Sequence, residues 1–235
     1  MKDEKILFYK YTFEFEDGSK KFIQLNLNPE TLDLIQDENL EKPDWAKHGN
    51  FLCPMECLRK NESPYCAIAL NINHIIRLFS DLPSFQKVKV YVETNNRTYF
   101  KETSLQVGIG SLFGIIMPTC GCPTLGKLKP LVKHHLPFSS IEETEFRVFS
   151  MYLLAQYLFM KRDKETDWEM KNLKQLYEDI QSINRNIARK IADLEKLDAS
   201  INSVIVLNNF ADSVTFSIEE NLEAFEKLFG SWLTE

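Results

Sequence analysis

The sequence lacks an excess of basic residues, because 28 Lys and Arg residues stand against 34 Asp and Glu residues and leave a formal net charge of −6. Proteins that grip the phosphate backbone of nucleic acids need a basic surface. It also lacks an unbroken apolar segment of the ~20 residues that a membrane-spanning helix needs. No apolar stretch suited to a secretory signal follows the charged residues 1–5. We therefore expect a cytoplasmic protein that binds neither nucleic acid nor a membrane.

Signatures of common enzyme classes are missing as well. There is no Gly-x-Ser-x-Gly elbow and no His-Glu-x-x-His helix. The glycines over residues 108–114 have the wrong spacing for a dinucleotide-binding loop, and no lysine follows them as in a P-loop. The five cysteines are odd in number and should be reduced in the cytoplasm, so we expect no closed disulfide framework. The sequence names no reaction.

Alternating apolar residues predict two β-hairpins in the first half of the chain. Residues 6–27 contain two alternating segments on either side of the turn signal Asp17-Gly18. Residues 88–101 repeat this pattern around Asn95-Asn96. Between the hairpins, residues 67–79 carry apolar side chains on one helical face. We interpret this half as a four-stranded antiparallel sheet packed with helices, which makes the fold α+β.

Three further helices are indicated before residue 165. Asn28, followed by proline, is suited to begin a short helix. Ser104 is placed to cap a helix over residues 105–117, whose glycines would allow a neighbouring element to approach closely. Ser140 and Glu143 fit a capping box that opens a helix to about Arg162. That last helix is apolar enough to be central in the fold.

A heptad pattern marks the C-terminal third. Apolar residues recur every seven positions, with companions between them: Leu173, Ile180, Ile187, Leu194 and Ile201, with Leu176, Ile183 and Leu197. This predicts a long amphipathic helix over residues 167–201 whose seam either packs within the chain or joins two copies in a homodimer. Residues 202–217 favour β or irregular structure, and an amphipathic helix over residues 219–233 follows. We divide the chain into an α+β domain at 1–160 and a helical C-terminal extension at 161–235.

Cysteine and histidine are the best candidates for a site. Thiolates and imidazoles are the ligands that zinc and iron–sulfur clusters prefer. Cys53 and Cys122 each precede a proline, which would place the thiol at a helix N-terminus and lower its pKa. The opposing interpretation is that the cysteines pack as small hydrophobic core residues. The residues concerned are Cys53, Cys57 and Cys66 of an irregular stretch over 37–66, which also holds His48, then Cys120, Cys122, His134 and His135.

The sequence also resembles a family of uncharacterised bacterial proteins over residues 5–160. The resemblance rests on a Cys-Pro pair, Tyr65-Cys66 with Ala69-Leu70-Asn71, Gly121-Cys122-Pro123, His135-Leu136-Pro137-Phe138, Glu142-Glu143-Thr144 and Ser150 to Tyr157. It implies shared Cys and His positions and no known activity. Two residues separate the first two cysteines in that family and three do so here, and serine is usual where Cys120 stands. The resemblance thus favours a site made of Cys53, Cys57, Cys66, Cys122 and His135.

These observations lead to one main hypothesis and two rivals. We expect Cys53, Cys57 and Cys66, joined by Cys122 or His135, to bind zinc or an iron–sulfur cluster. With four protein ligands the metal would have a structural or sensory role. One rival is a metal-free interaction module that associates through the 167–201 helix. The other is a thiol-dependent enzyme that uses Cys122.

Overall fold

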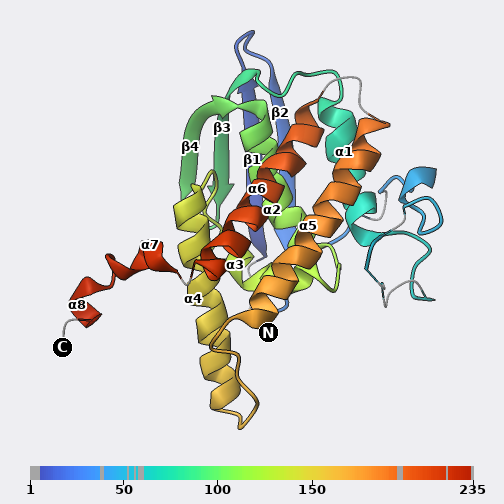
Figure 1. Ribbon diagram of the computed structural model, residues 1–235. Coiled ribbons are helices and arrows are strands. Elements are labelled where there is room, and N and C mark those ends of the chain that lie inside the picture. The colour runs from blue at the N-terminus through green and yellow to red at the C-terminus, as the bar shows by residue number, and fades with distance from the viewer. Residues whose placement is uncertain are drawn as a thin grey trace, which may run out of the picture.

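The computed structural model describes residues 6–37, 40–51, 53–55, 57, 61–194, 198–220 and 222–233. Strands β1 (Leu7–Phe15) and β2 (Lys20–Leu27) form the first hairpin, and β3 (Lys87–Thr94) and β4 (Thr98–Ser104) form the second. The hairpins join through β1 and β3 into an antiparallel sheet with the order β2-β1-β3-β4 (Figure 1). This confirms the predicted α+β class and the four-stranded sheet.

One face of β1 supplies much of the core. Tyr9, Tyr11, Phe13 and Phe15 alternate along the strand and are at most 6% exposed. The Phe13 ring lies 4.9 Å from the ring of Phe79, at the end of α1 (Ala67–Phe79). The predicted helix over residues 67–79 is confirmed, and its apolar stripe packs on this face of the sheet.

Helix α2 (Leu105–Thr119) lies between the sheet and α6 (Ala199–Glu219). At Gly108, an added Cβ atom would stand 2.6 Å from Cε1 of Phe13, whereas at Gly110 it would stand 3.5 Å from the carbonyl oxygen of Ser203 on α6. The glycines therefore allow close neighbours on both sides, as predicted. Helix α5 (Lys171–Ala192) packs along α6 and completes the layer farthest from the sheet (Figure 1).

Short elements connect these layers. A 3₁₀ turn, η1 (Asp44–Ala46), lies before α1, while η3 (Leu125–Leu128) and α3 (Lys129–Lys133) link α2 to α4 (Ile141–Met160). The short helix-like segment predicted at Asn28 is a single turn and not a helix. Asn28 caps this turn as expected, because its side-chain oxygen accepts hydrogen bonds from the amides of Glu30 and Thr31, at 2.9 and 3.0 Å.

The predicted helix over residues 167–201 is divided in two. Helix α5 ends at Ala192, and Ile201 belongs to α6. The seam residues that lie on α5, from Leu173 to Ile187, are buried, whereas Leu194 is exposed. Leu197 lies outside the described residues. The apolar seam of α5 is therefore covered by α6 of the same chain.

The predicted β or irregular structure over residues 202–217 is wrong, because these residues form most of α6. Val204, Ala211 and Val214 on this helix are at most 1% exposed. Burial of this face against α2 and α5 outweighs the small helix penalty of β-branched residues. The predicted helix over residues 219–233 is instead two short helices, α7 (Glu223–Glu226) and α8 (Gly230–Leu233).

Helix α4 begins as predicted but is not central. Its capping box is formed by Ser140 and Glu143. Its second half projects beyond the body of the molecule, and α7 and α8 extend away as an arm (Figure 1). Only four α4 residues are buried, namely Glu145, Val148, Phe149 and Gln156. None of the helices in the described ranges is long and apolar enough to cross a membrane.

Candidate metal centre

All five cysteines line one cavity of about 450 Å³. They reach it from two parts of the chain: the loop between η1 and α1, which ends at Cys66, and the turn at the end of α2. We name it the cysteine cavity and define it by Cys53, Cys57, Cys66, Cys120, Cys122 and His48. The structure thus brings together four of the five predicted site residues.

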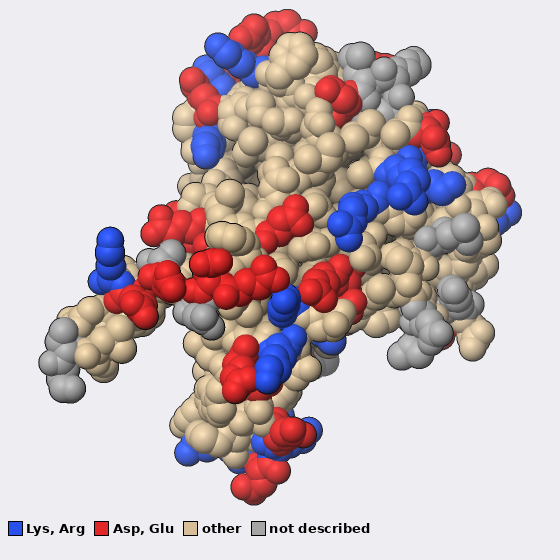
Figure 2. Space-filling model, viewed as in Figure 1, with Lys and Arg blue, Asp and Glu red and all other residues tan. Residues whose placement is uncertain are grey.

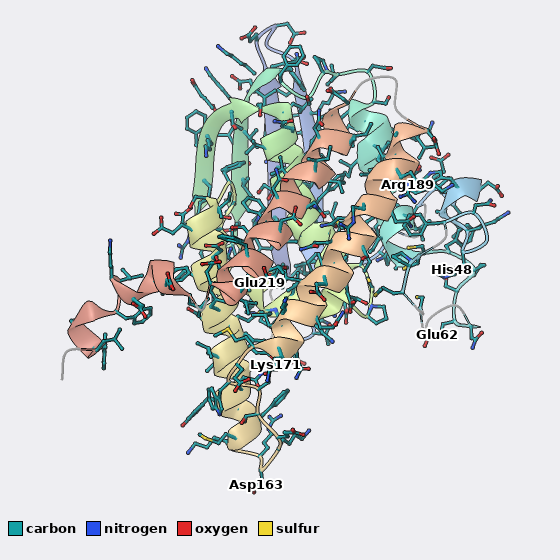
Figure 3. All side chains as sticks on the ribbon, in the orientation of Figure 1. His48, Glu62, Asp163, Lys171, Arg189 and Glu219 are labelled. Carbon is teal, nitrogen blue, oxygen red and sulfur yellow. The ribbon has the colours of Figure 1, made fainter. Side chains whose placement is uncertain are left out.

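Backbone and side-chain hydrogen bonds hold the loop that carries Cys53 and Cys57 against α1. Lys47 and Tyr65 form an isolated β-bridge, and the amide of His48 donates to the carbonyl of Pro64 at 2.9 Å. The indole of Trp45 donates to the Asn73 side chain on α1 at 2.9 Å. His48 marks this loop at one side of the molecule (Figure 3). These contacts return the loop to the start of α1, where Cys66 lies.

Cys66 is the residue before the first turn of α1, and its side chain is buried. Burial raises the pKa of the Cys66 thiol to about 12, although the amides of Ile68 and Ala69 act in the opposite direction. Negative charge on Cys53 or Cys122, which line the same cavity, would raise it further. Without a cation in the cavity, Cys66 is therefore a neutral thiol at pH 7.

Cys122 follows Gly121, whose backbone conformation only glycine adopts easily. Gly121 has a φ of +103°, which carries the chain out of α2 and towards η3. Burial raises the pKa of the Cys122 thiol, and the amides of Leu125 and Thr124 offset part of that effect. The predicted lowering of this pKa is wrong, because desolvation outweighs the amides. Cys53 is followed by a bend rather than by the predicted helix.

Cys120 differs from Cys122 although only Gly121 separates them. It is buried at the C-terminal end of α2, where its thiol donates to the carbonyl of Met117 at 3.3 Å. Burial raises the Cys120 pKa, and the carbonyl end of a helix disfavours negative charge. Cys120 thus suits a neutral thiol, which agrees with the serine expected there from the family resemblance.

His135 lies apart from the cysteines. Its Nε2 atom is 3.0 Å from the hydroxyl of Tyr11 and 3.3 Å from that of Ser111, in a different cavity. Loss of water contact, with a smaller effect from the charge of Arg147, lowers the pKa of His135 to about 3. His134 is exposed. His48, which the sequence offered as a ligand within the loop, is the histidine that lines the cysteine cavity.

Sequence reasoning did not find Asp33, which also lines the cysteine cavity and pairs with Lys129. It lies in a turn after β2, with no ligand-like spacing to any cysteine. Within the described residues, no three Cys, His, Asp or Glu side chains already stand close enough together to hold a metal ion. The thiols share a cavity without forming a closed coordination sphere.

The relationships of the chain extend over both its sheet and its C-terminal helices. No curated protein and no solved structure matches it. The sequence profile of the Domain of unknown function (DUF6901) matches residues 9–230. This range takes in α5 and α6, which the sequence resemblance left out. Because the match spans most of the chain, the protein belongs to the DUF6901 family.

Proposed function

We propose that this protein binds a soft metal ion, zinc or the iron of an iron–sulfur cluster, through Cys53, Cys57, Cys66 and Cys122. The observation that carries the proposal is the arrival of these thiols in one cavity from two segments that are far apart in the sequence. Thiols are the ligands that soft metal ions prefer. Four thiolates are also a complete ligand set for a structural zinc ion.

A metal ion would change the charge of the thiols in the cavity. Burial raises the pKa of Cys66 and of Cys122, so negative charge on either sulfur is costly without a cation beside it. A bound metal ion would reverse this balance, because thiols that coordinate a metal lose their protons. Amides at the start of α1 and in the turn after Pro123 would then stabilise the two thiolates. Coordination requires the thiols to lie closer together than they do in the structure, where no three ligand side chains of the described residues are close enough to hold an ion.

A metal here would have a structural or sensory role. Four protein ligands leave no open position for a substrate. The ion would tie the loop between η1 and α1 to the start of α1 and to the turn after α2. Its expected effect is therefore to stabilise this edge of the fold.

The rival hypotheses have less support. A nucleophilic cysteine needs a lowered pKa or an adjacent base, but burial raises the pKa of Cys122, and His135 lines the other cavity. An interaction module that works through the heptad seam needs an exposed seam, but the seam residues of α5 are buried.

Elemental analysis and absorption spectroscopy of the full chain, purified without chelators, test the proposal. We expect about one zinc ion per chain in a colourless protein, or visible absorbance from a cluster. Cobalt(II) added to the reduced, metal-free protein should produce thiolate-to-cobalt charge-transfer bands. A metal-free protein that also gives no such bands would overturn the proposal.

The pair of neighbouring cysteines provides a matched control. Cys122→Ser should lose the bound metal, whereas Cys120→Ser should keep it, because the Cys120 thiol points to the carbonyl of Met117. Circular dichroism would establish that both variants remain folded. Equal metal content in Cys122→Ser and the wild type would contradict the assignment of Cys122 as a ligand.

A further inference from the structure

A second cavity, of about 170 Å³, lies among α2, α5, α6 and residues 125–147. It shares no lining residue with the cysteine cavity. Most of its wall is aliphatic or aromatic, with Met117, Phe138, Ile180 and Phe210 as representative contacts. We name it the interhelical cavity. Because protein interiors are normally filled, a space of this size requires an explanation.

Missing side chains on α2 help to keep the interhelical cavity open. Gly110 and Gly114 both line it, one helical turn apart. A Cβ atom at Gly114 would meet only Cε1 of His135, at an ordinary contact distance of 3.8 Å. The site therefore has room for a larger residue, although glycine costs roughly 1 kcal/mol of helix stability relative to alanine.

A buried polar atom points to a ligand in this cavity. Asn184 on α5 lines the cavity and is only 2% exposed. Its side-chain oxygen has no hydrogen-bond partner within the part of the chain that the structure describes. An unpaired buried acceptor is costly, so a native protein that keeps one usually supplies a donor from a bound molecule or water. The ligand should therefore carry an O–H or N–H group.

Arg147 favours an aromatic ligand over an aliphatic one. Its Nη2 atom donates to the carbonyls of Leu131 and His134, at 2.7 and 2.9 Å. Among the described residues, no carboxylate forms an ion pair with this part-buried guanidinium. The face of an electron-rich ring attracts such a cation, whereas a cationic ligand would be repelled.

We propose that the interhelical cavity binds a small neutral molecule with one aromatic ring and one O–H or N–H donor. An engineered protein cavity of about 150 Å³ with apolar walls admits benzene, so the volume here suits a single substituted ring. The donor would bond to the Asn184 side-chain oxygen, and the ring would pack between the apolar walls. This site does not depend on the proposed metal.

Phenol is the probe that tests this proposal on the full chain. Benzene has the ring without the donor, and cyclohexanol has the donor without the aromatic face. Titrations followed by NMR should show saturable binding of phenol, roughly tenfold tighter than benzene, as expected for one good hydrogen bond. Cyclohexanol should bind more weakly than phenol. Benzene that binds as tightly as phenol, or no saturable binding of phenol, would overturn the proposal and leave water as the donor.

Two substitutions test separately the space of the cavity and the hydrogen bond to Asn184. Gly114→Leu should fill the space and remove binding of all three probes. Asn184→Leu should keep the binding of benzene and remove the preference for phenol over benzene. Retention of that preference in Asn184→Leu would contradict the role of Asn184. The comparison of probes on the wild type decides the matter even if a variant fails to fold.

Discussion

At the scale of single residues, His135 shows how burial fixes a protonation state. Its Nε2 atom meets the hydroxyls of Tyr11 and Ser111, and Tyr11 is fully buried. Desolvation lowers the pKa of His135 to about 3, so the ring stays neutral in the folded protein across the physiological range. In the unfolded chain, the same ring binds a proton below pH 6.5.

This difference predicts a stability that falls as the medium becomes acidic. Below pH 6.5 the unfolded state binds more protons than the folded state, so the free energy of unfolding decreases until the pH reaches the folded pKa near 3. Between pH 7 and pH 5 the loss from this residue amounts to about 2 kcal/mol. Urea unfolding of the wild type and of His135→Gln at pH 7 and pH 5 measures this. The free energy of unfolding of His135→Gln should fall by about 2 kcal/mol less than that of the wild type between the two pH values.

His74 provides the control, because it is exposed on α1. His74→Gln should keep the pH dependence of the wild type. If His135→Gln lost as much stability as the wild type between pH 7 and pH 5, the ring would have to be protonated in the folded state.

The gathering of the cysteines with His48 could be predicted from residue type and motif, whereas the position of His135 could not. Cys53, Cys57 and Cys66 lie in one loop, and the resemblance added Cys122. His135 was grouped with them because the resemblance implied shared Cys and His positions. The fold separates the two residues, because η3 and α3 carry the chain away from the turn after α2 and place His135 beside β1.

At the scale of elements, two glycines of α2 differ in how closely other residues pack against them. An added Cβ atom at Gly108 would stand 2.6 Å from the Phe13 ring and 3.1 Å from Val90 of the sheet. At Gly114 the nearest atom, on His135, would be 3.8 Å away. The same substitution on one helix should therefore have opposite effects at the two positions.

Gly108→Ala should lower the free energy of unfolding by about 1–3 kcal/mol, because the methyl group must displace packed core side chains. Gly114→Ala should raise it by up to about 1 kcal/mol, because alanine favours the helix and nothing opposes the methyl group. Chemical denaturation followed by circular dichroism measures both. A gain in stability from Gly108→Ala would show that α2 does not approach the sheet closely there, and a loss from Gly114→Ala would show that Gly114 has no room for a methyl group.

The sequence predicted most of the helices and strands that have one polar and one apolar face. Alternation revealed the strands, and the residues 67–79 gave a clear apolar face. Helix α6 was missed because it contacts both α2 and α5, so its apolar residues do not form a single stripe. Helix α4 is similarly rich in apolar residues, but it projects from the body instead of being buried. Sequence periodicity does not distinguish these two situations.

At the scale of the whole molecule, apolar side chains remain uncovered on two projecting parts. The second half of α4 exposes Leu154, Tyr157, Leu158, Phe159 and Met160, and the α7–α8 arm exposes Leu228, Phe229, Trp232 and Leu233. Acidic side chains gather where the arm leaves the body, whereas α8 carries no charged residue (Figure 2). Asp163 marks the tip of the α4 projection, which also carries Lys161, Arg162 and Lys164 (Figure 3). Contiguous apolar surfaces of this kind mark interaction sites.

These surfaces predict self-association that depends on protein concentration. The homodimer expected from the sequence would then use α4 and the arm, because the α5 seam is buried. The contact would join apolar side chains, because the tip of α4 carries both acidic and basic residues. Sedimentation velocity should show a dimer that Trp232→Glu weakens at least tenfold. Phe85→Glu is the matched control, since Phe85 is 75% exposed and Trp232 80%, but Phe85 lies outside both projections. A monomer at every concentration, or equal weakening by both substitutions, would contradict this arrangement.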